Sequence, residues 1–346
     1  MTGDRAQQLT LGDVARRAGV SPMTVSNVIN GKAGVRPATR ARVLEAIQAT
    51  GYRVNLVARA LAGGRNRVLS VFTPQLNRPY ASEVVQGAAE AAGALGYDLV
   101  VMMLAAEGNT DLSMMTRLAS GALLIQPADD GWRRPGLPPH VVSVDGPGEY
   151  PLGVDNHGGA RQAMRHLLDL GHTRIAFISG LQGEDGPPAD LPPHIGGRRN
   201  DAAERLRGYR EALQEAGLRL PDAYLQHGDY SKASGERAAR TVLTLPEPPS
   251  ALFVSGDAMA LGALHVAQDL GLRVPEDLSL VGFDDLPLAA ASRPALTTVR
   301  QPLQRLGEVA VGLLVALAEG REVALPAPFA TRLVVRESSG PPQTGP

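Results

Sequence analysis

Apolar residues near the start of the chain recur at helical spacing. They stand three and four positions apart at Leu11, Val14, Ala15 and Ala18. This interval predicts a short helix over 11–18. Thr10 and Asp13 stand at its start as a capping box with Asp in place of the usual Glu, which supports a helix beginning there. Gly19 then supplies a tight turn.

A second helix is predicted directly after this turn. Ser21 and Pro22 form an N-cap and first-turn pair, and an apolar stripe follows at Val25, Val28 and Ile29. The opposite face carries uncharged side chains, namely Pro22, Met23, Ser26, Asn27 and Asn30. Short polar side chains suit base edges better than open solvent. The two helices are therefore interpreted as a helix-turn-helix whose second helix is the recognition helix.

A third helix is predicted between Pro37 and Gly51, with Thr39 in its first turn. The apolar residues expected to point inward are Val43, Leu44 and Ile47. Arg40 and Arg42 remain available to phosphates, which position a protein on DNA. The pattern thus predicts an all-α head of three helices.

From residue 68 onward, short apolar runs alternate with longer stretches of helical spacing. The runs read VLSVF, YDLVVMML, GALLIQP, HVVSVD, RIAFISG, ALFVSG and LSLVGFDD, and helical stretches cover 80–95, 157–170, 203–216, 257–270 and 302–319. Apolar runs joined by helices predict parallel sheets covered on both faces. Roughly 270 residues exceed what one such sheet usually needs, so two α/β lobes are favoured. A (β/α) barrel is the rival, but HVVSVD and YPLGVD follow each other without a helix, as at a crossing between lobes.

The net charge of −1 hides an uneven distribution. Residues 1–67 hold 11 Lys and Arg against 3 Asp and Glu, and the rest of the chain holds 23 against 32. A basic head before an acidic body points to a polyanionic partner, because Lys and Arg release counterions from phosphates. A solvated basic arm is the plainer alternative.

Other classes of protein are excluded by composition. The chain has no Cys, which excludes disulfides, thiol nucleophiles and cysteine-bound metal. It has no uninterrupted apolar run of membrane-spanning length and no apolar signal-peptide core, so we expect a cytoplasmic protein with no membrane partner. No cofactor is expected, since the phosphate-binding, nucleophile and zinc motifs GxxxxGK[ST], GxSxG, GxGxxG and HExxH do not occur.

Polar residues that end the apolar runs are candidates for ligand binding, because ligands of open α/β sheets sit beyond the carboxyl ends of strands. Three such residues are Asp145, Asp257 and Asp284, whose carboxylates could accept hydrogen bonds from vicinal hydroxyls. Asp257 could equally cap the helix that follows it. Asp284 and Asp285 could be interpreted as an acid and base pair, but adjacent residues leaving a strand point in different directions.

Further ligand contacts are predicted from residue type. The guanidinium of Arg205 could donate a fork of hydrogen bonds to ring or hydroxyl oxygens. Tyr80, Tyr230 and Phe283 could stack on the apolar face of a sugar ring. The predicted ligand site therefore combines these four residues with the three carboxylates.

The segment DVARRAGVSPMTVSNVINGKAGVRPATRARVLEAIQATGYRVNLVARAL resembles the DNA-binding head and hinge of the lactose-repressor (LacI-type) transcription regulators. The shared pattern is DVA, AGVS, TVS, VxN, TR, RV, GY, N, AR and L at these spacings. The departure is Val54, where these proteins often have Pro. The DNA contacts implied in this chain are Thr10, Ser21, Pro22, Met23, Thr24, Ser26, Asn27, Asn30, Arg40, Asn55, Ala58, Arg59 and Leu61.

The resemblance implies that residues 55–61 form a hinge helix, which folds when two copies lie side by side in the DNA minor groove. A helix this short is marginal alone in water. Leu61 matches the leucine that these proteins insert between two base pairs, and such a wedge kinks the duplex. The alternative makes Leu61 a core residue of an ordinary linker helix.

The same resemblance implies a core like the periplasmic sugar-binding proteins, with two lobes around a cleft. Arg205 and Tyr209 match the RxxGY pattern of these proteins. The expected domains are a helix-turn-helix domain over 1–52, a hinge helix and linker over 53–67, an effector-binding and dimerisation core over 68–338, and a disordered tail over 339–346. Within the core, one lobe takes about 68–154 and 303–327, and the other about 155–302 and 328–338. Two departures are Gly256, where many members carry Asn, and a Pro- and Gly-rich segment after Gly180 that is expected to be mobile or a lid.

The sequence thus predicts a homodimeric transcription regulator, a repressor in most such proteins, and no enzyme. Its partners would be pseudo-palindromic double-stranded operator DNA and a small effector, a sugar or sugar derivative. Two alternatives remain: a soluble sugar receptor, which the basic head disfavours, and an α/β enzyme acting on sugars, for which no catalytic constellation is found.

Overall fold

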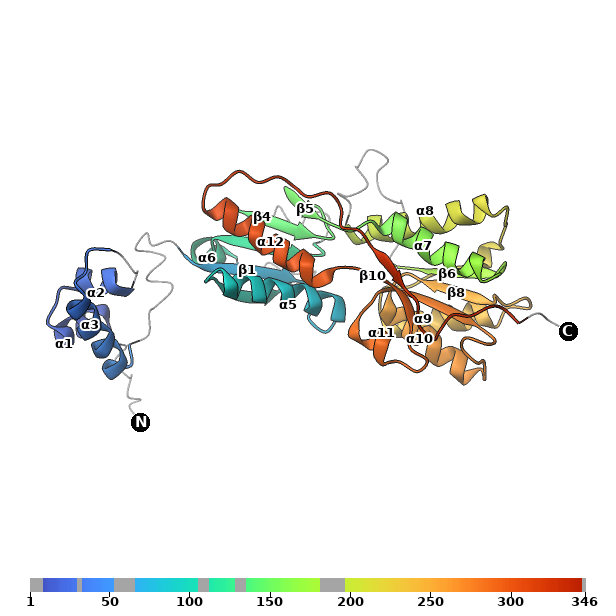
Figure 1. Cartoon of the computed structure of the whole chain (residues 1–346), viewed down its shortest axis with the longest axis horizontal. Coiled ribbons are helices and arrows are strands. Elements are labelled where there is room, and N and C mark those ends of the chain that lie inside the picture. The colour runs from blue at the N-terminus through green and yellow to red at the C-terminus, as the bar shows by residue number, and fades with distance from the viewer. Residues whose placement is uncertain are drawn as a thin grey trace. The chain divides into compact units, whose positions relative to one another are not determined.

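A computed structural model of the chain describes residues 9–29, 33–52, 66–104, 112–127, 135–180 and 197–343, with only the backbone described for 197–200. The chain divides into two compact units, Met1–Asn66 and Arg67–Pro346, and each is described by itself (Figure 1). The predicted hinge over 55–61 and most of the Pro- and Gly-rich segment, 181–196, lie outside the described residues.

Three helices form the first unit, α1 (Leu11–Ala18), α2 (Pro22–Ile29) and α3 (Pro37–Thr50). The predicted capping box is confirmed, because Asp13 N donates to Thr10 Oγ1 at 3.3 Å and Thr10 N donates to Asp13 Oδ2 at 2.9 Å. Gly19 ends α1 in the left-handed region with φ 62°, a conformation that favours glycine.

The core of this unit takes one fully buried valine from each helix, Val14, Val25 and Val43. The prediction that Leu44 points inward is wrong, because Leu44 is 53% exposed and Ala46 is buried. Neighbouring helical residues are rotated by about 100°, so a helix that buries Val43 turns Leu44 out of the core.

The second unit begins with a sheet of five parallel strands in the order β2-β1-β3-β4-β5. The strands are β1 (Val68–Thr73), β2 (Asp98–Met103), β3 (Gly121–Ile125), β4 (Val141–Val144) and β5 (Tyr150–Leu152). Helices α5 (Pro79–Ala94) and α12 (Leu303–Ala318) pack on one face, and α6 (Ser113–Leu118) packs on the other. This sheet and its helices form the first lobe.

The second lobe contains a six-stranded sheet in the order β11-β10-β9-β8-β6-β7. Its strands are β6 (Ile175–Ser179), β7 (Leu225–His227), β8 (Ala251–Val254), β9 (Ser279–Asp284), β10 (Thr297–Arg300) and β11 (Arg332–Val334), and all neighbours are parallel except β10 and β11. Two open sheets exclude the (β/α) barrel and confirm the two-lobed α/β core.

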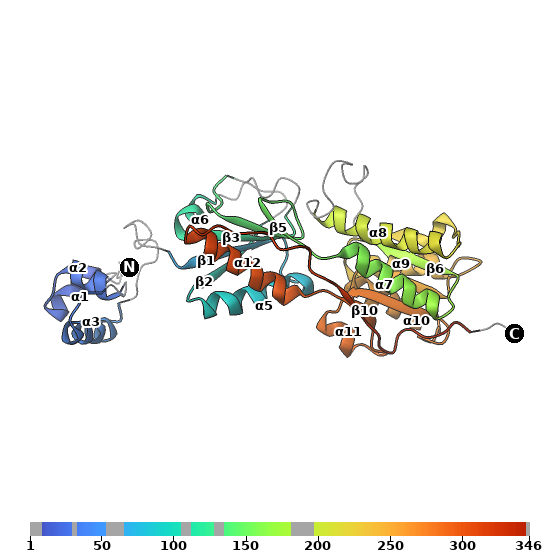
Figure 2. The same ribbon diagram turned by 45° about the horizontal axis from the view of Figure 1, so that its top comes forward.

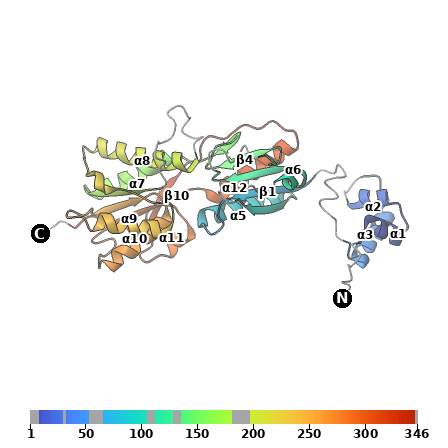
Figure 3. The ribbon, with the colours of Figure 1, turned by 180° about the vertical axis from the view of Figure 1, so that it is seen from behind.

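Helices cover both faces of this second sheet. They are α7 (Asn156–Asp169), α8 (Gly197–Glu215), η2 (Asp222–Tyr224), α9 (Lys232–Leu243), α10 (Asp257–Asp269) and α11 (Pro287–Ala291). Helices α7 and α8 lie on one face, and α9 and α10 on the other, as Figure 2 and the view from behind in Figure 3 show. Each face has its own apolar core, because alternate residues of a strand point to opposite faces.

The chain passes between the lobes three times. The passages lie between β5 and α7, between β10 and α12, and between α12 and β11. The first and third run side by side, since Phe329 N donates to Gly153 O at 2.9 Å and Asp155 N donates to Phe329 O at 2.8 Å. Each lobe is therefore assembled from segments that are distant in the sequence.

Helices α5 and α12 approach each other closely through two glycines. A Cβ atom added to Gly307 would lie 2.0 Å from Val84 O, and one added to Gly87 would lie 1.9 Å from Gln304 O. Gly312, on the same α12, has nothing within 4 Å of such an atom. Glycine is therefore required at the helix contact and not along the whole helix.

Candidate ligand pocket and nucleic-acid interface

A pocket of about 520 Å³ lies between the two lobes at the carboxyl ends of their strands. Its walls are Gln75, Asn77, Arg78, Pro79, Tyr80, Gln126 and Asp145 from the first lobe, and Asp201, Arg205, Tyr230, Ser231, Lys232, Gly256, Ala258, Leu261, Asp284, Leu286 and Leu288 from the second. Five of the seven residues predicted to bind ligand are among them, and Asp257 and Phe283 are not.

Backbone strain is concentrated at this pocket. Among the described non-glycine residues, five have a positive φ, and four of them line the pocket: Gln126 (49°), Asp145 (49°), Tyr230 (64°) and Asp284 (118°). Side chains other than glycine rarely adopt this region, and such outliers cluster at binding sites. The strand ends are thus held in conformations that aim their side chains at the pocket.

Asp145 and Tyr80 form the first-lobe side of the site. Asp145 follows β4 directly, and Tyr80 lies in the first turn of α5. The Tyr80 hydroxyl donates to Asp145 Oδ2, and both side chains are largely buried. Asp145 is therefore oriented by a neutral donor from another element.

Arg205, from α8, is held on three sides. Its Nε donates to Asn156 Oδ1 at 2.8 Å and its Nη1 to Ser255 O at 2.6 Å. Its guanidinium carbon lies 3.8 Å from the centroid of the Phe283 ring, a cation–π contact. Phe283 is fully buried in this position, so its ring supports Arg205 from behind and does not reach the pocket.

Asp284, at the end of β9, is buried at 8% exposure. Gln301 Nε2 donates to its Oδ1 at 2.6 Å. Burial raises the pKa of the Asp284 carboxyl to about 6, although nearby Arg205 and the bond from Gln301 act in the opposite direction. Above pH 6 this carboxylate is charged and can accept hydrogen bonds from a ligand.

Asp285 points away from Asp284, as adjacent residues at a strand end are expected to do. It forms ion pairs with Arg300 and, at 2.6 Å, with Arg336. Asp285 does not line the pocket. The two carboxylates thus have separate surroundings, which disfavours a joint acid and base role.

Asp257, the first residue of α10, connects this helix to neighbouring segments by hydrogen bonds. It is fully buried, and its carboxylate accepts hydrogen bonds from Leu286 N at 2.8 Å and the Thr298 hydroxyl at 2.6 Å. Burial, followed by the charge of Asp284, raises the pKa of Asp257 well above its usual value. Its side chain therefore connects the start of α10 to the segment after β9 and to β10.

The ring of Tyr230 lies across two glycines. A Cβ atom on Gly180 would fall 2.0 Å from Tyr230 Cζ, and one on Gly256 would fall 3.2 Å from its Cδ1. A longer side chain at position 256 would meet this ring. Tyr230 thus occupies the space that the side chain of Asn, common at this position in similar proteins, would need at position 256.

Sequence reasoning missed several polar residues of the site. Asp201 lies one helical turn before Arg205 and accepts from Asn156 Nδ2 at 2.9 Å, and its i, i+4 spacing could have revealed it. Arg78 links the lobes by donating from Nη1 to Asp229 O at 3.1 Å. Gln126 and Gln301 follow strands directly, but amides at such positions are common and gave no distinct signal.

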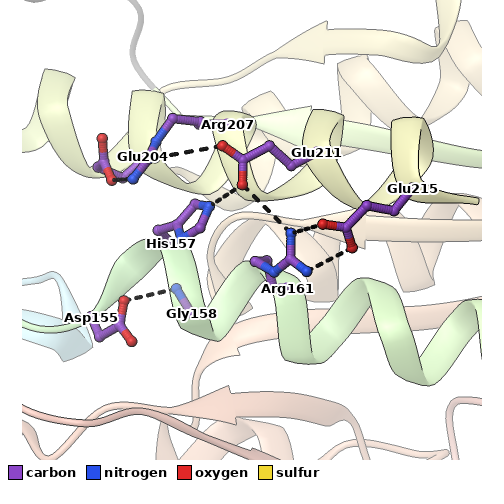
Figure 4. Close-up of polar contacts among 8 residues, drawn as sticks. All are labelled: Asp155, His157, Gly158, Arg161, Glu204, Arg207, Glu211 and Glu215. Atoms are coloured by element: carbon purple, nitrogen blue, oxygen red, sulfur yellow. Dashed lines mark hydrogen bonds and ion pairs between the residues drawn. The ribbon is translucent and has the colours of Figure 1, made fainter.

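Helix α8 is fixed on α7 by a cluster of charged side chains (Figure 4). His157 Nε2 lies 2.6 Å from Glu211 Oε2, and Arg161 Nη2 lies 2.7 Å from Glu215 Oε2. The hydrogen bond with His157 lowers the pKa of Glu211. Since α8 carries Arg205, these contacts help to set the position of the guanidinium.

Four of the predicted DNA contacts in the first unit also form hydrogen bonds within that unit. Thr10 caps α1, and Ser21 Oγ accepts from Thr24 N at 3.2 Å and lies 2.9 Å from the Thr24 hydroxyl. Arg40 Nη1 donates to Val28 O at 3.4 Å, near the end of α2. Thr10, Ser21 and Thr24 therefore also stabilise the starts of α1 and α2, and Arg40 connects α3 to α2.

Other predicted DNA contacts differ in their surroundings. Pro22 and Met23 are exposed, and Ser26 and Asn27 are partly exposed. The predicted contacts that lie outside the described residues are Asn30, Asn55, Ala58, Arg59 and Leu61.

Two further properties follow from the part of the chain that the structure describes. No group of three His, Cys, Asp or Glu side chains is placed there to hold a metal ion. None of the helices there is long and apolar enough to cross a membrane.

Comparison with known families finds two matches along the chain. Residues 10–55 match the bacterial regulatory proteins of the lacI family, and residues 164–339 match a periplasmic binding protein-like domain. The first match contains the helix-turn-helix, and the second contains most of the second lobe.

Individual proteins resemble nearly the whole chain. The ribose operon repressor of Escherichia coli (strain K12) is 36% identical over 318 residues, covering 88% of this chain and 92% of that protein. The structure of the lac repressor dimer bound to operator and the anti-inducer ONPF matches with a TM-score of 0.80 at 28% identity, covering 96% of this chain and 100% of that one. The complex of the transcriptional regulator CelR with cellobiose matches with a TM-score of 0.66 at 32% identity, covering 95% and 99%.

Proposed function

We propose, on the basis that this chain belongs to the LacI family of bacterial regulatory proteins, that its effector is a sugar or sugar derivative bound in the pocket between the lobes. The chain is a DNA-binding transcriptional repressor under the control of a small-molecule effector, and it is not an enzyme.

The convergence of Asp145, Arg205 and Asp284 on one pocket carries the sugar proposal. Carboxylates accept hydrogen bonds from neighbouring hydroxyls, and a guanidinium donates to ring and hydroxyl oxygens. Tyr80 and Tyr230 line the same pocket and supply aromatic surface. The similar regulator CelR binds cellobiose, a sugar. In this proposal Asp257 and Phe283 position Asp284 and Arg205 and do not touch the effector.

A titration of the full-length protein with free mono- and disaccharides, D-ribose and cellobiose among them, tests this assignment. We expect one site per chain for the effector sugar. We also expect that sugar to shift operator affinity about 5- to 150-fold, a coupling of typical size. Tight binding of a nucleobase or amino acid, with no response to any sugar, would contradict the proposal.

The assembly we propose is a homodimer. Strand β2 is an edge of the first-lobe sheet, and its Val101 and Met103 are exposed apolar residues. An exposed apolar edge strand favours pairing with another chain. The similar lac repressor is a dimer on its operator.

The domain organisation we propose keeps the helix-turn-helix over 1–52, the hinge helix within 53–67, the two-lobed core over 68–338 and a tail over 339–346. The start of this tail is not disordered as expected, because Ser339 Oγ lies 2.9 Å from Thr297 Oγ1 and Gly340 N donates to Ser279 Oγ at 3.0 Å. The proposed DNA contacts are the exposed face of α2 and four residues of the hinge, Asn55, Ala58, Arg59 and Leu61. The protein would act in the cytoplasm, where the DNA of a bacterium is found.

Arg40→Ala is expected to weaken binding to every operator alike by about 2- to 10-fold. Arg40 donates to Val28 O, so its loss loosens α2 as a whole without removing a base contact. Its loss from the phosphate-facing surface should also reduce the salt slope of binding by about one. Fluorescence anisotropy with several operator sequences at four salt concentrations measures both effects. Loss confined to some sequences would instead make Arg40 a base-reading residue.

A further inference from the structure

We propose that α2 reads A·T base pairs, with Asn27 hydrogen-bonding an adenine edge and Met23 packing on a thymine methyl group in each half of the operator. The proposal rests on the proposed function and specifies its DNA partner. Two observations support it: which side chains of α2 are accessible to DNA, and which already form hydrogen bonds within the first unit.

Asn27 and Met23 are two accessible side chains of α2 with different chemistry, an amide and an apolar thioether. Met23 is 68% exposed. Asn27 is partly exposed, and its amide has no hydrogen-bond partner among the described residues. The Thr24 hydroxyl, in contrast, lies 2.9 Å from Ser21 Oγ at the start of the helix. An uncommitted amide can form both of its hydrogen bonds with a base.

Helix α2 has no Arg or Lys that could bind guanine through a bidentate fork. The commonest specific contact to guanine is a bidentate fork from Arg or Lys to O6 and N7. No residue of Pro22–Ile29 is charged. The nearby Arg40 directs Nη1 to Val28 O at the end of the helix. Base reading by α2 therefore relies on its uncharged side chains, among which Asn27 supplies the amide and Met23 the apolar surface.

The chemistry of both side chains fits A·T pairs. The Asn27 amide offers one donor and one acceptor, which match adenine N7 and N6 in the major groove. Guanine presents two acceptors at the same edge, so only one of these bonds could form there. The Met23 thioether is apolar and adaptable, and thymine is the base that presents a methyl group in the groove.

The spacing of the two residues predicts where the bases lie. Met23 and Asn27 are four positions apart, so their Cβ atoms are about 5 to 6 Å apart on one face of the helix. Successive base pairs are about 3.4 Å apart along the duplex. The two A·T pairs should therefore be adjacent or separated by one base pair.

Selection of the full-length protein on a random double-stranded DNA library, followed by sequencing, tests the proposal. The wild-type half-sites should contain A·T at two positions with this spacing. Asn27→Ala should lose the preference at one position and Met23→Ala at the other. Asn27→Arg should change the first preference from A·T to G·C, because it supplies the missing fork. The matched control is Gln48→Ala, an exposed amide of α3, which should leave every preference unchanged.

Measured affinities give the size of the effect. Replacing the A·T pair read by Asn27 with G·C should weaken wild-type binding about 5- to 150-fold, and this ratio should fall towards one in Asn27→Ala. A palindromic site with G·C at the positions that respond to Asn27 and Met23 would overturn the inference and leave the proposed function intact. Preferences that survive in Asn27→Ala and Met23→Ala would overturn it equally. No enrichment of any site would overturn both.

Discussion

Asp284→Asn is expected to weaken effector binding about 10- to 150-fold and, at the same time, to stabilise the effector-free protein at neutral pH. The loss of affinity follows because the variant loses a charged acceptor in the pocket. The gain in stability follows because burial raises the pKa of Asp284 from its usual 3.8 to about 6. A neutral amide avoids the cost of a buried charge, which is about 3 kcal/mol for a shift of this size, and Gln301 can still donate to it.

The difference in the free energy of unfolding between Asp284→Asn and the wild type should depend on pH, and this dependence provides the sharper test. A carboxyl whose pKa is raised by folding binds its proton more tightly in the folded state, so its contribution to stability is present at low pH. That contribution disappears as the pH rises from about 4 to about 6. The free energy of unfolding of Asp284→Asn should therefore separate from that of the wild type across this window and stay above it. Urea unfolding at a series of pH values measures the separation.

Asp285→Asn is the matched control for this prediction. The same change at the adjacent residue should lower stability, because it removes the partner of Arg300 and Arg336. It should leave effector affinity nearly unchanged, because Asp285 does not line the pocket. Unchanged effector affinity in Asp284→Asn, or destabilisation by it at pH 7, would refute our account of Asp284.

Gly307→Ala is expected to destabilise the first lobe by about 3 kcal/mol or more, seen as a fall in melting temperature of about 6 to 12 °C. The added methyl group would lie 2.0 Å from Val84 O, a backbone atom of α5 that can move only with its helix. Differential scanning calorimetry of the full-length protein measures the effect.

Gly312→Ala controls for the substitution itself. Gly312 lies five residues further along α12, is exposed, and has nothing within 4 Å of an added Cβ atom. Alanine there should raise stability by up to about 1 kcal/mol, because it favours the helix more than glycine does. Equal effects of the two substitutions would mean that the close approach of α5 and α12 is not what requires Gly307.

Much of the architecture could be predicted from local pattern. The capping box of Thr10 and Asp13 and the alternation of apolar runs with helical stretches depend on neighbours in the sequence, which the sequence displays directly. Leu44 shows the limit of this reasoning. Its apolar side chain fits the predicted stripe, but the third helix is rotated so that Val43 and Ala46 meet the other helices. Rotation about a helix axis is set by tertiary packing.

The pocket was predictable to a similar degree. Asp145 and Asp284 could be identified because strand ends of parallel sheets share one edge, whereas Arg205, on α8, was identified from the chemistry of its side chain and from the family pattern around it. Phe283 could not be assigned correctly, because its position beneath Arg205 depends on how α8 packs on the sheet. Gln301 was missed because its contact with Asp284 joins strand ends 17 residues apart, and an amide in that place has no sequence signature.

The route of the chain between the lobes also determines the order in which they can be completed during synthesis. The five strands of the first sheet end at β5, but α12, which covers one face of that sheet, begins about 150 residues later. Leu306, Val311 and Leu314 of α12 pack in the same core as Leu69 and Leu123. At 5 to 20 residues per second, that core waits roughly 8 to 30 s for its last helix. A ribosome that stops before α12 therefore releases a chain whose first lobe lacks its covering helix, which makes truncated products prone to aggregate.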